Sequence, residues 1–110
     1  MKRGEIWIID LERGFGREIH KKRPALIISN ETVHHLSHAI IVPASSIVPK
    51  TIGIEMVLIG KTEGVIKKSV LLPIFIRSVD EKRLVKRVGT LSREKLQEVE
   101  DALKLVLSLP

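Results

Sequence analysis

The sequence lacks cysteine altogether and has very few aromatic residues. Without a thiol the chain can form no disulfide and can offer no thiolate to a metal or a substrate, a composition that fits a reducing compartment. Aromatic residues make up 3% of the chain and are limited to Trp7, Phe15 and Phe75. The hydrophobic core must therefore be aliphatic, built mainly from valine, isoleucine and leucine.

Long apolar segments are also missing. The apolar segment near the N-terminus runs only from Ile6 to Ile9 before Asp10 interrupts it, and no other segment approaches the length of a signal peptide's apolar region or a membrane span. With 110 residues the chain is long enough for one domain and too short for two. We therefore predict a single domain over residues 1–110 that is cytoplasmic and has no membrane partner.

Positive charge is abundant and unevenly distributed. The net charge is +6, and lysine and arginine are concentrated in residues 13–23 and 61–95, whereas acidic residues prevail elsewhere. Basic segments of this kind favour a polyanionic partner, because each neutralised phosphate releases counterions. The alternative is a charge-rich, solvated surface without a partner.

Short β-branched segments separated by turn residues recur as far as Val88, as in an all-β domain. In the second segment Pro24 would stand at the first position of a strand, and in the fourth Gly53 would form a bulge. In the fifth, Pro73 argues for an edge or a break. Strands are predicted over residues 4–10, 25–29, 38–43, 51–59, 68–77 and 84–88.

The periodicity changes at the C-terminus. Apolar residues recur at three- and four-residue spacing from Leu96 to Val106, which predicts a helix over residues 92–107 with Ser92 as its N-cap. Together with the strands this predicts a mainly β (α+β) fold, a small β-barrel covered by one terminal helix. Three further leucines lie off the helix's main apolar face and indicate a subunit contact: Leu105, Leu107 and Leu109.

A series of short motifs follows in a characteristic order along the chain. They are GEIWIID (4–10), RPALIISN (23–30), PASS (43–46), SVLL (69–72), IRSVDEKRL (76–84) and GTLSREKLQEVEDALKLVL (89–107). In this order and spacing the chain resembles the MazF/PemK toxin family over nearly its whole length.

The resemblance implies a small SH3-like β-barrel of about six to seven strands with a C-terminal α-helix, similar to MazF and CcdB and assembled as a homodimer. It implies the toxin of a type II toxin–antitoxin system, inhibited by a cognate antitoxin with an acidic, partly disordered tail. The implied activity is sequence-selective cleavage of single-stranded RNA, including mRNA. No metal or other cofactor is implied, because the substrate's own 2′-hydroxyl attacks and leaves a 2′,3′-cyclic phosphate and a 5′-hydroxyl.

The resemblance also places the catalytic groups. The principal arginine of the family corresponds to Arg23, and its second catalytic position, a threonine or serine, corresponds to Ser45. A guanidinium is a rigid fork of donors that matches two phosphate oxygens, and a hydroxyl adds a neutral donor. We expect Arg23 chiefly to stabilise charge, because a guanidinium stays protonated in proteins, and proton transfer by this residue is left open. The expected RNA-binding residues are Gly16, Arg17, Glu18, Lys21, Lys22, Ser46, Lys68, Phe75 and Arg77.

Histidines supply the side chains that titrate near neutral pH. His20, three residues before Arg23, is a candidate acid or base, with a solvated loop histidine as the alternative. His34, His35 and His38 cluster in one connection without a nearby carboxylate, so we expect no metal site there.

The chain departs from the family's usual pattern at three positions. Lys68 stands where relatives commonly have an acid, and Ile74 and Phe75 stand where they commonly have polar residues that contact bases and antitoxin. Base recognition would then depend more on stacking and shape, with Phe75 as the candidate stacking residue if it is exposed, and a place in the core as the alternative for this residue. The departures leave two alternatives: an RNA-binding module that does not cut, or a CcdB-like inhibitor of a topoisomerase.

Overall fold

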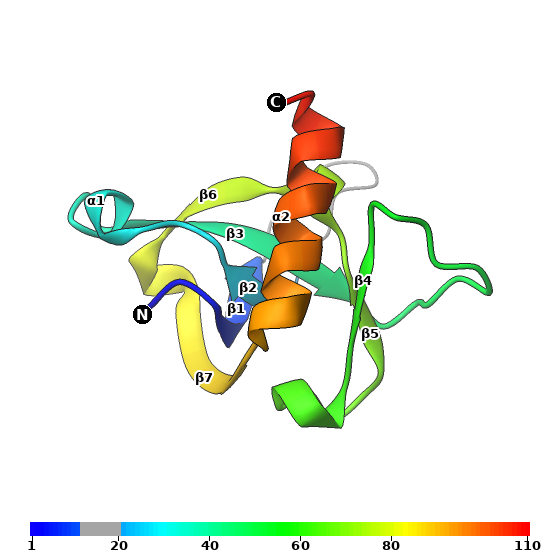
Figure 1. The fold of residues 1–110 in the computed structure, drawn as a ribbon. Coiled ribbons are helices and arrows are strands. Elements are labelled where there is room, and N and C mark those ends of the chain that lie inside the picture. Colours follow the sequence, from blue (N-terminus) through cyan, green and yellow to red (C-terminus); the bar gives the residue numbers. More distant parts are fainter. Residues whose placement is uncertain (12–20) are drawn as a thin grey trace.

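The structure is a computed structural model that describes residues 1–11 and 21–110 (Figure 1). Seven strands form one sheet: β1 (Glu5–Leu11), β2 (Lys21–Ile27), β3 (His38–Ser45), β4 (Val57–Ile59), β5 (Ser69–Leu71), β6 (Arg77–Asp80) and β7 (Leu84–Thr90). The helices are α1 (Glu31–His34) and α2 (Arg93–Leu107), with 3₁₀ turns η1 (Lys61–Glu63), η2 (Pro73–Phe75) and η3 (Glu81–Arg83). No helix among the described residues is both long and apolar enough to cross a membrane.

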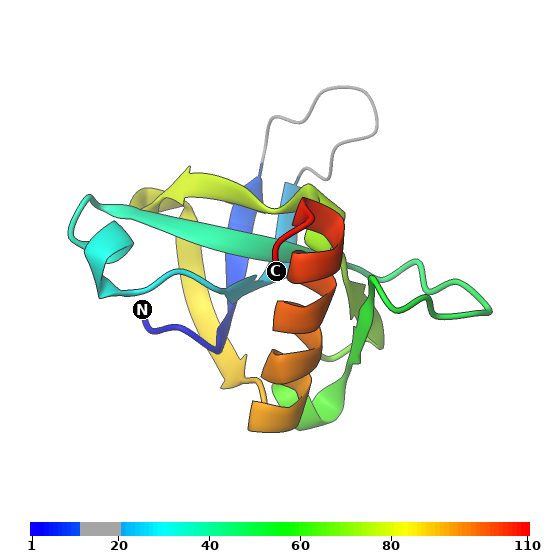
Figure 2. The ribbon, with the colours of Figure 1, turned by 45° about the horizontal axis from the view of Figure 1, so that its top comes forward.

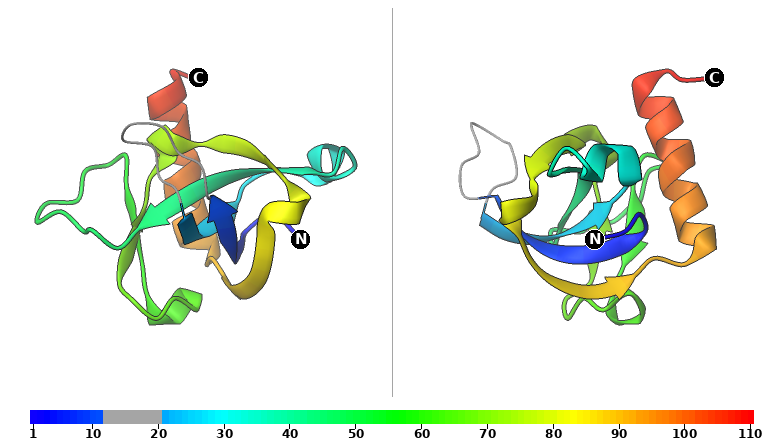
Figure 3. Two further views of the ribbon diagram at one scale, coloured as in Figure 1. Left: turned by 180° about the vertical axis from the view of Figure 1, so that it is seen from behind. Right: turned by 90° about the vertical axis from the view of Figure 1, so that its left-hand side faces the viewer.

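The sheet is antiparallel and strongly curled. Its strands follow the order β4-β5-β3-β2-β1-β7, and β6 pairs with the first half of β3. The long strand β3 therefore pairs with β2 along one edge and with β6 and then β5 along the other. Seen from the side, the strands curl into an open ring (Figure 3, right). The predicted mainly β fold with a C-terminal helix is confirmed in this curled half-barrel.

Two aliphatic clusters form the core, as the shortage of aromatic residues requires. One lies inside the curl and includes Ile9, Ile27 and Ile41, with Trp7 packed at its margin. The other includes Leu26 and lies between the sheet and α2, which runs across the sheet (Figure 1). Its residues from the helix are Val99 and Leu103, with Leu96 packed against them.

Helix α2 begins after the predicted N-cap residue Ser92, and its predicted apolar face packs against the core. The Ser92 side chain accepts a hydrogen bond from the N–H of Lys95, which caps the first turn. The predicted outward position of the three leucines is also confirmed, because each is about half exposed: Leu105, Leu107 and Leu109.

Three predicted strands are corrected by the structure. The second begins at Lys21, so Pro24 lies within β2 and not at its start. The ladder between β2 and β3 covers only Ala25–Ile27, so Pro24 stands where one edge of β2 is unpaired, which is where a sheet accepts proline. Pro73 does break the fifth segment, which becomes β5, η2 and β6.

The fourth predicted strand is wrong over residues 51–56. Only Val57–Ile59 forms a strand, and the preceding connection projects away from the barrel (Figure 2). Its Ile54 side chain is 80% exposed, so the apolar alternation there has no core to pack against. Gly53 lies in this connection and forms no bulge.

The register shifts lie instead between β1 and β7. Ile6 pairs with Gly89 and Trp7 with Arg87, so Val88 is an extra residue in β7, and a second shift follows Ile8. Such bulges increase the local twist of a strand. They help β7 to curl around the barrel.

Candidate functional site

A pocket of about 360 Å³ opens where β1, β2 and β7 meet the turn before β5. We call it the Arg23 pocket. Four of its lining residues are cations and none is a carboxylate: Lys22, Arg23, Lys67 and Lys86. The other lining residues are small or aliphatic: Ile8, Pro24, Ser46, Gly64, Val65, Ile66, Ser69 and Val88. The pocket therefore combines apolar walls with strong positive charge, which suits an anionic ligand that has an apolar part.

Arg23 belongs to β2 and pairs with Ile9 of β1, so two strands fix its backbone. Its Nε is buried and has no hydrogen-bond partner among the described residues. An unpartnered buried donor is costly unless a ligand or water satisfies it. Among the described residues, the Arg23 Nε therefore has an unused hydrogen-bond donor.

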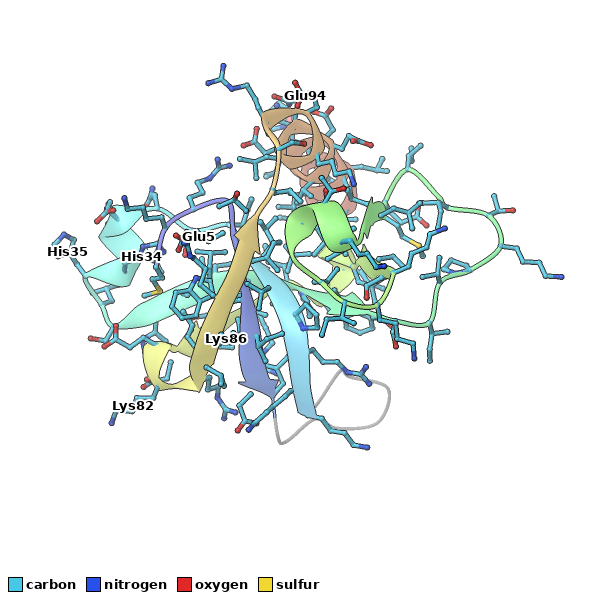
Figure 4. The ribbon with its side chains drawn as sticks, turned by 90° about the horizontal axis from the view of Figure 1, so that it is seen from below. Glu5, His34, His35, Lys82, Lys86 and Glu94 are labelled. Carbon is cyan, nitrogen blue, oxygen red and sulfur yellow. The ribbon has the colours of Figure 1, made fainter. Side chains whose placement is uncertain are left out.

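Backbone packing fixes the opposite wall of the pocket. A Cβ on Gly64 would lie 2.0 Å from the carbonyl oxygen of Val88, and one on Gly89 would lie 2.1 Å from that of Glu63. Gly64 also adopts a φ of 90°, which favours glycine. The turn after η1 consequently lies directly against β7, the strand that carries Lys86 (Figure 4). Lys67 and Lys86 line the same pocket.

The serines of the PASS motif stand at the end of β3. Ser46 lines the Arg23 pocket, whereas Ser45 pairs with Val70 of β5 and is half-buried. The Ser45 Oγ accepts a hydrogen bond of 3.1 Å from the N–H of Ile47. This contact uses a lone pair, so the hydroxyl hydrogen stays available as a donor.

Other expected site residues are spread more widely. Lys21 lies at the exposed start of β2, next to Lys22. Phe75 is half-buried in η2, which packs against α2, and Arg77 pairs with Ile41 of β3. Neither lines the Arg23 pocket, and Lys68 lines a neighbouring one. Four expected residues lie outside the described part of the chain: Gly16, Arg17, Glu18 and His20.

The histidine cluster has a local structural role. The Nε2 of His34 lies 2.8 Å from the Oγ of Ser29, which also accepts the N–H of Ile40. These contacts attach α1 to the strands on either side of it. His34 and His35 lie on the other side of β7 from η1 (Figure 4), away from the Arg23 pocket.

A carboxylate anchors β7 beside β1. Glu5 accepts hydrogen bonds from the Trp7 indole at 3.1 Å and the Lys2 backbone N–H at 2.7 Å, and it forms an ion pair with Arg87 at 3.3 Å. Burial, the largest single effect, raises the pKa of Glu5. The hydrogen bonds and the charges of the N-terminal amine and Arg87 together outweigh burial, so the pKa lies below its ordinary value.

Sequence reasoning missed Lys67, Lys86 and Ile66 as site residues. Lys67 had one available signal, since it follows the turn residues of the basic segment. Lys86 had none, because its position depends on the shifted register between β1 and β7.

The curled sheet, the terminal helix and the cationic pocket define a small barrel protein with a positively charged site at the edge of its sheet. A family model described as "PemK-like, MazF-like toxin of type II toxin-antitoxin system" matches residues 2–107. The chain belongs to this family.

Individual relatives agree with this assignment. Endoribonuclease MazF9 of Mycobacterium tuberculosis is 34% identical over 115 residues, covering 99% of this chain and 98% of the relative. The crystal structure of MazF from Deinococcus radiodurans has a TM-score of 0.84 at 23% identity, covering 98% of this chain and 96% of the other. A mycobacterial endoribonuclease in complex with its cognate antitoxin has a TM-score of 0.78 at 21% identity, covering 100% and 97%.

Proposed function

We propose that this protein is an endoribonuclease toxin that cleaves single-stranded RNA, including mRNA, in the Arg23 pocket. The observation that carries the proposal is the pocket itself, in which three lysines and no carboxylate accompany Arg23, whose buried Nε has no partner among the described residues. The 34% identical relative is an endoribonuclease, which supports the same activity.

The proposed reaction is a transesterification within the RNA. The 2′-oxygen attacks the adjacent phosphorus, the bond from phosphorus to the 5′-oxygen breaks, and the products are a 2′,3′-cyclic phosphate and a 5′-hydroxyl. The proton of the 2′-hydroxyl leaves as the attack proceeds, and a proton reaches the departing 5′-oxygen. His20 remains the candidate for one of these transfers.

Charge stabilisation is the part that the described residues can perform. Two negatively charged oxygens develop on phosphorus during the attack, and the Arg23 fork can donate to both. Lys22, Lys67 and Lys86 raise the positive potential of the pocket. Ser45, which adjoins the lining residue Ser46 in the chain, is the proposed hydroxyl donor. Because these side chains supply the neutralising charge, we propose that cleavage requires no metal.

The proposal extends to assembly and control. The protein would act in the cytoplasm as a single domain of residues 1–110 and as a homodimer, with a cognate antitoxin that covers the cationic surface with an acidic, partly disordered tail. A relative of the same fold is known in complex with its cognate antitoxin. The pocket's positive charge is complementary to such a tail.

The test of the proposed chemistry is cleavage of an RNA oligonucleotide in EDTA, followed by analysis of the fragment ends. We expect a 2′,3′-cyclic phosphate and a 5′-hydroxyl, and no cleavage after a 2′-deoxy substitution at the cut position. Cleavage that survives the 2′-deoxy substitution would refute the mechanism. RNA that binds but stays intact would favour the non-cutting module.

A further inference from the structure

A second pocket adjoins the Arg23 pocket at Ile66. It has a volume of about 390 Å³ and lies over β4, η1 and the start of α2. Three of its lining residues are lysines, and we call it the Lys61 pocket: Lys61, Lys68 and Lys95. Its single carboxylate is Glu63.

Both carboxylate oxygens of Glu63 already have partners within the protein. Its side chain is 4% exposed, its Oε2 lies 3.2 Å from the Nζ of Lys95, and its Oε1 accepts the N–H of Gly60 at 2.7 Å. Lys61 and Lys68 are exposed and form no ion pair with any of the described residues. The Lys61 pocket therefore has two positive charges that no carboxylate compensates.

The two pockets share one wall, which the turn before β5 forms. Lys67 lines the Arg23 pocket and Lys68 lines the Lys61 pocket, so two consecutive lysines line different pockets. Ile66 lines both, and its side chain is 93% exposed. The exposed Ile66 side chain thus offers an apolar contact between two cationic pockets.

We propose that the Lys61 pocket is a second phosphate-binding subsite, which holds the RNA strand as it continues beyond the cleavage position. The inference rests on the proposed function, because it takes the RNA to lie in the Arg23 pocket. Phosphates would lie in the two pockets, and the intervening sugar or base would pack on Ile66. Single-stranded RNA matches this pattern of regularly spaced charge with apolar faces between.

The subsite predicts a measurable salt dependence. Each phosphate contact with a single strand contributes about −0.7 to the slope of log K against log salt concentration. Replacing Lys61 and Lys68 together with glutamine should therefore reduce the slope by about 1.4, which corresponds to about tenfold weaker binding near 0.15 M salt.

The experiment compares two 2′-O-methyl RNA oligonucleotides, which cannot be cut, with lengths of about four and about twelve nucleotides. Binding is measured against salt for the parent, for Lys61→Gln/Lys68→Gln, and for Lys82→Gln/Lys104→Gln. The last variant removes the same charge from lysines that line neither pocket, and Lys82 lies on the other side of β7 from η1 (Figure 4). We expect weaker binding only for the longer oligonucleotide and only in the first variant.

Several results would overturn the subsite. One is an unchanged salt slope and affinity of the Lys61→Gln/Lys68→Gln variant for the longer oligonucleotide. Another is a loss of affinity that is equal for both oligonucleotide lengths. A third is a loss confined to an acidic probe, a poly-glutamate peptide, which would assign the pocket to an acidic protein segment. Cleavage of unmodified RNA by the parent is measured in parallel. A parent that needs the lysines for binding but does not cut would refute the proposed function and leave the subsite standing.

Discussion

Among single residues, Arg23 is the one on which the proposed RNA cleavage depends most. Its motif position could be predicted from the sequence because the arginine–proline step precedes a recognisable apolar strand. What the sequence could not show is that this arginine lies within β2 and has a buried, unpartnered Nε, since burial depends on strands that are distant along the chain.

Arg23→Lys should lower the cleavage rate by about 100-fold or more, because a lysine keeps the charge but cannot donate to two oxygens in a fixed geometry. The rate is measured under single-turnover conditions, and the urea midpoint of unfolding should stay close to the parent's. A variant that cuts at the parental rate would show that the guanidinium is not needed.

The two serines of the PASS motif can be separated by substitution. Ser45→Ala should reduce cleavage by about 100-fold, since it removes the proposed donor to the phosphate. Ser46→Ala is the matched control, which removes a hydroxyl from the pocket lining and should have a smaller effect. The reverse order of effects would assign the catalytic hydroxyl to Ser46.

At the scale of elements, the sequence predicted strands well where apolar alternation coincides with packing, as in β1 and β3. It failed over residues 51–56, where Ile54 is exposed and none of the apolar side chains is fully buried. It also missed α1, because a helix of four residues leaves too little periodicity to detect. The break at Pro73 in the fifth segment could be predicted, since proline has no N–H to donate to a β-sheet hydrogen bond.

The contact between η1 and β7 determines the shape of the Arg23 pocket, and Gly89→Ala tests it. The added Cβ would approach the Glu63 carbonyl oxygen to 2.1 Å, so the two backbones must separate. We expect a loss of about 1–3 kcal/mol in the free energy of unfolding, measured by denaturation, together with weaker RNA binding.

Gly60→Ala is the control for this element, because a Cβ there meets nothing within 4 Å and the φ of −162° suits any residue. Its free energy of unfolding should match the parent's. Equal stability of the Gly89 and Gly60 variants would mean that η1 is not held by this contact.

At the scale of the whole molecule, the curled sheet and its helix could be predicted as a class, but the strand order could not. The pairing of β3 with both β5 and β6, and the bulges between β1 and β7, come from tertiary packing and not from local preference. The shifted register between β1 and β7 brings Lys86 to the pocket, which explains why the sequence alone could not predict it.

The exposed leucines at the end of α2 predict assembly. Sedimentation should give twice the chain mass of 12.4 kDa, and Leu107→Glu should shift the protein towards a monomer because a buried carboxylate would oppose the contact. Lys104→Glu, an exposed position on the same helix, is the control. A parent that sediments as a monomer would refute the homodimer.

The central claim is that the Arg23 pocket cuts RNA without a metal. The most direct measurement incubates a long single-stranded RNA in EDTA with the parent, with Arg23→Ala and with Lys82→Ala as a charge-matched control. We expect discrete fragments from the parent and the Lys82 variant, and intact RNA from the Arg23 variant. Intact RNA with the parent, or equal cleavage by the parent and the Arg23 variant, would contradict this claim.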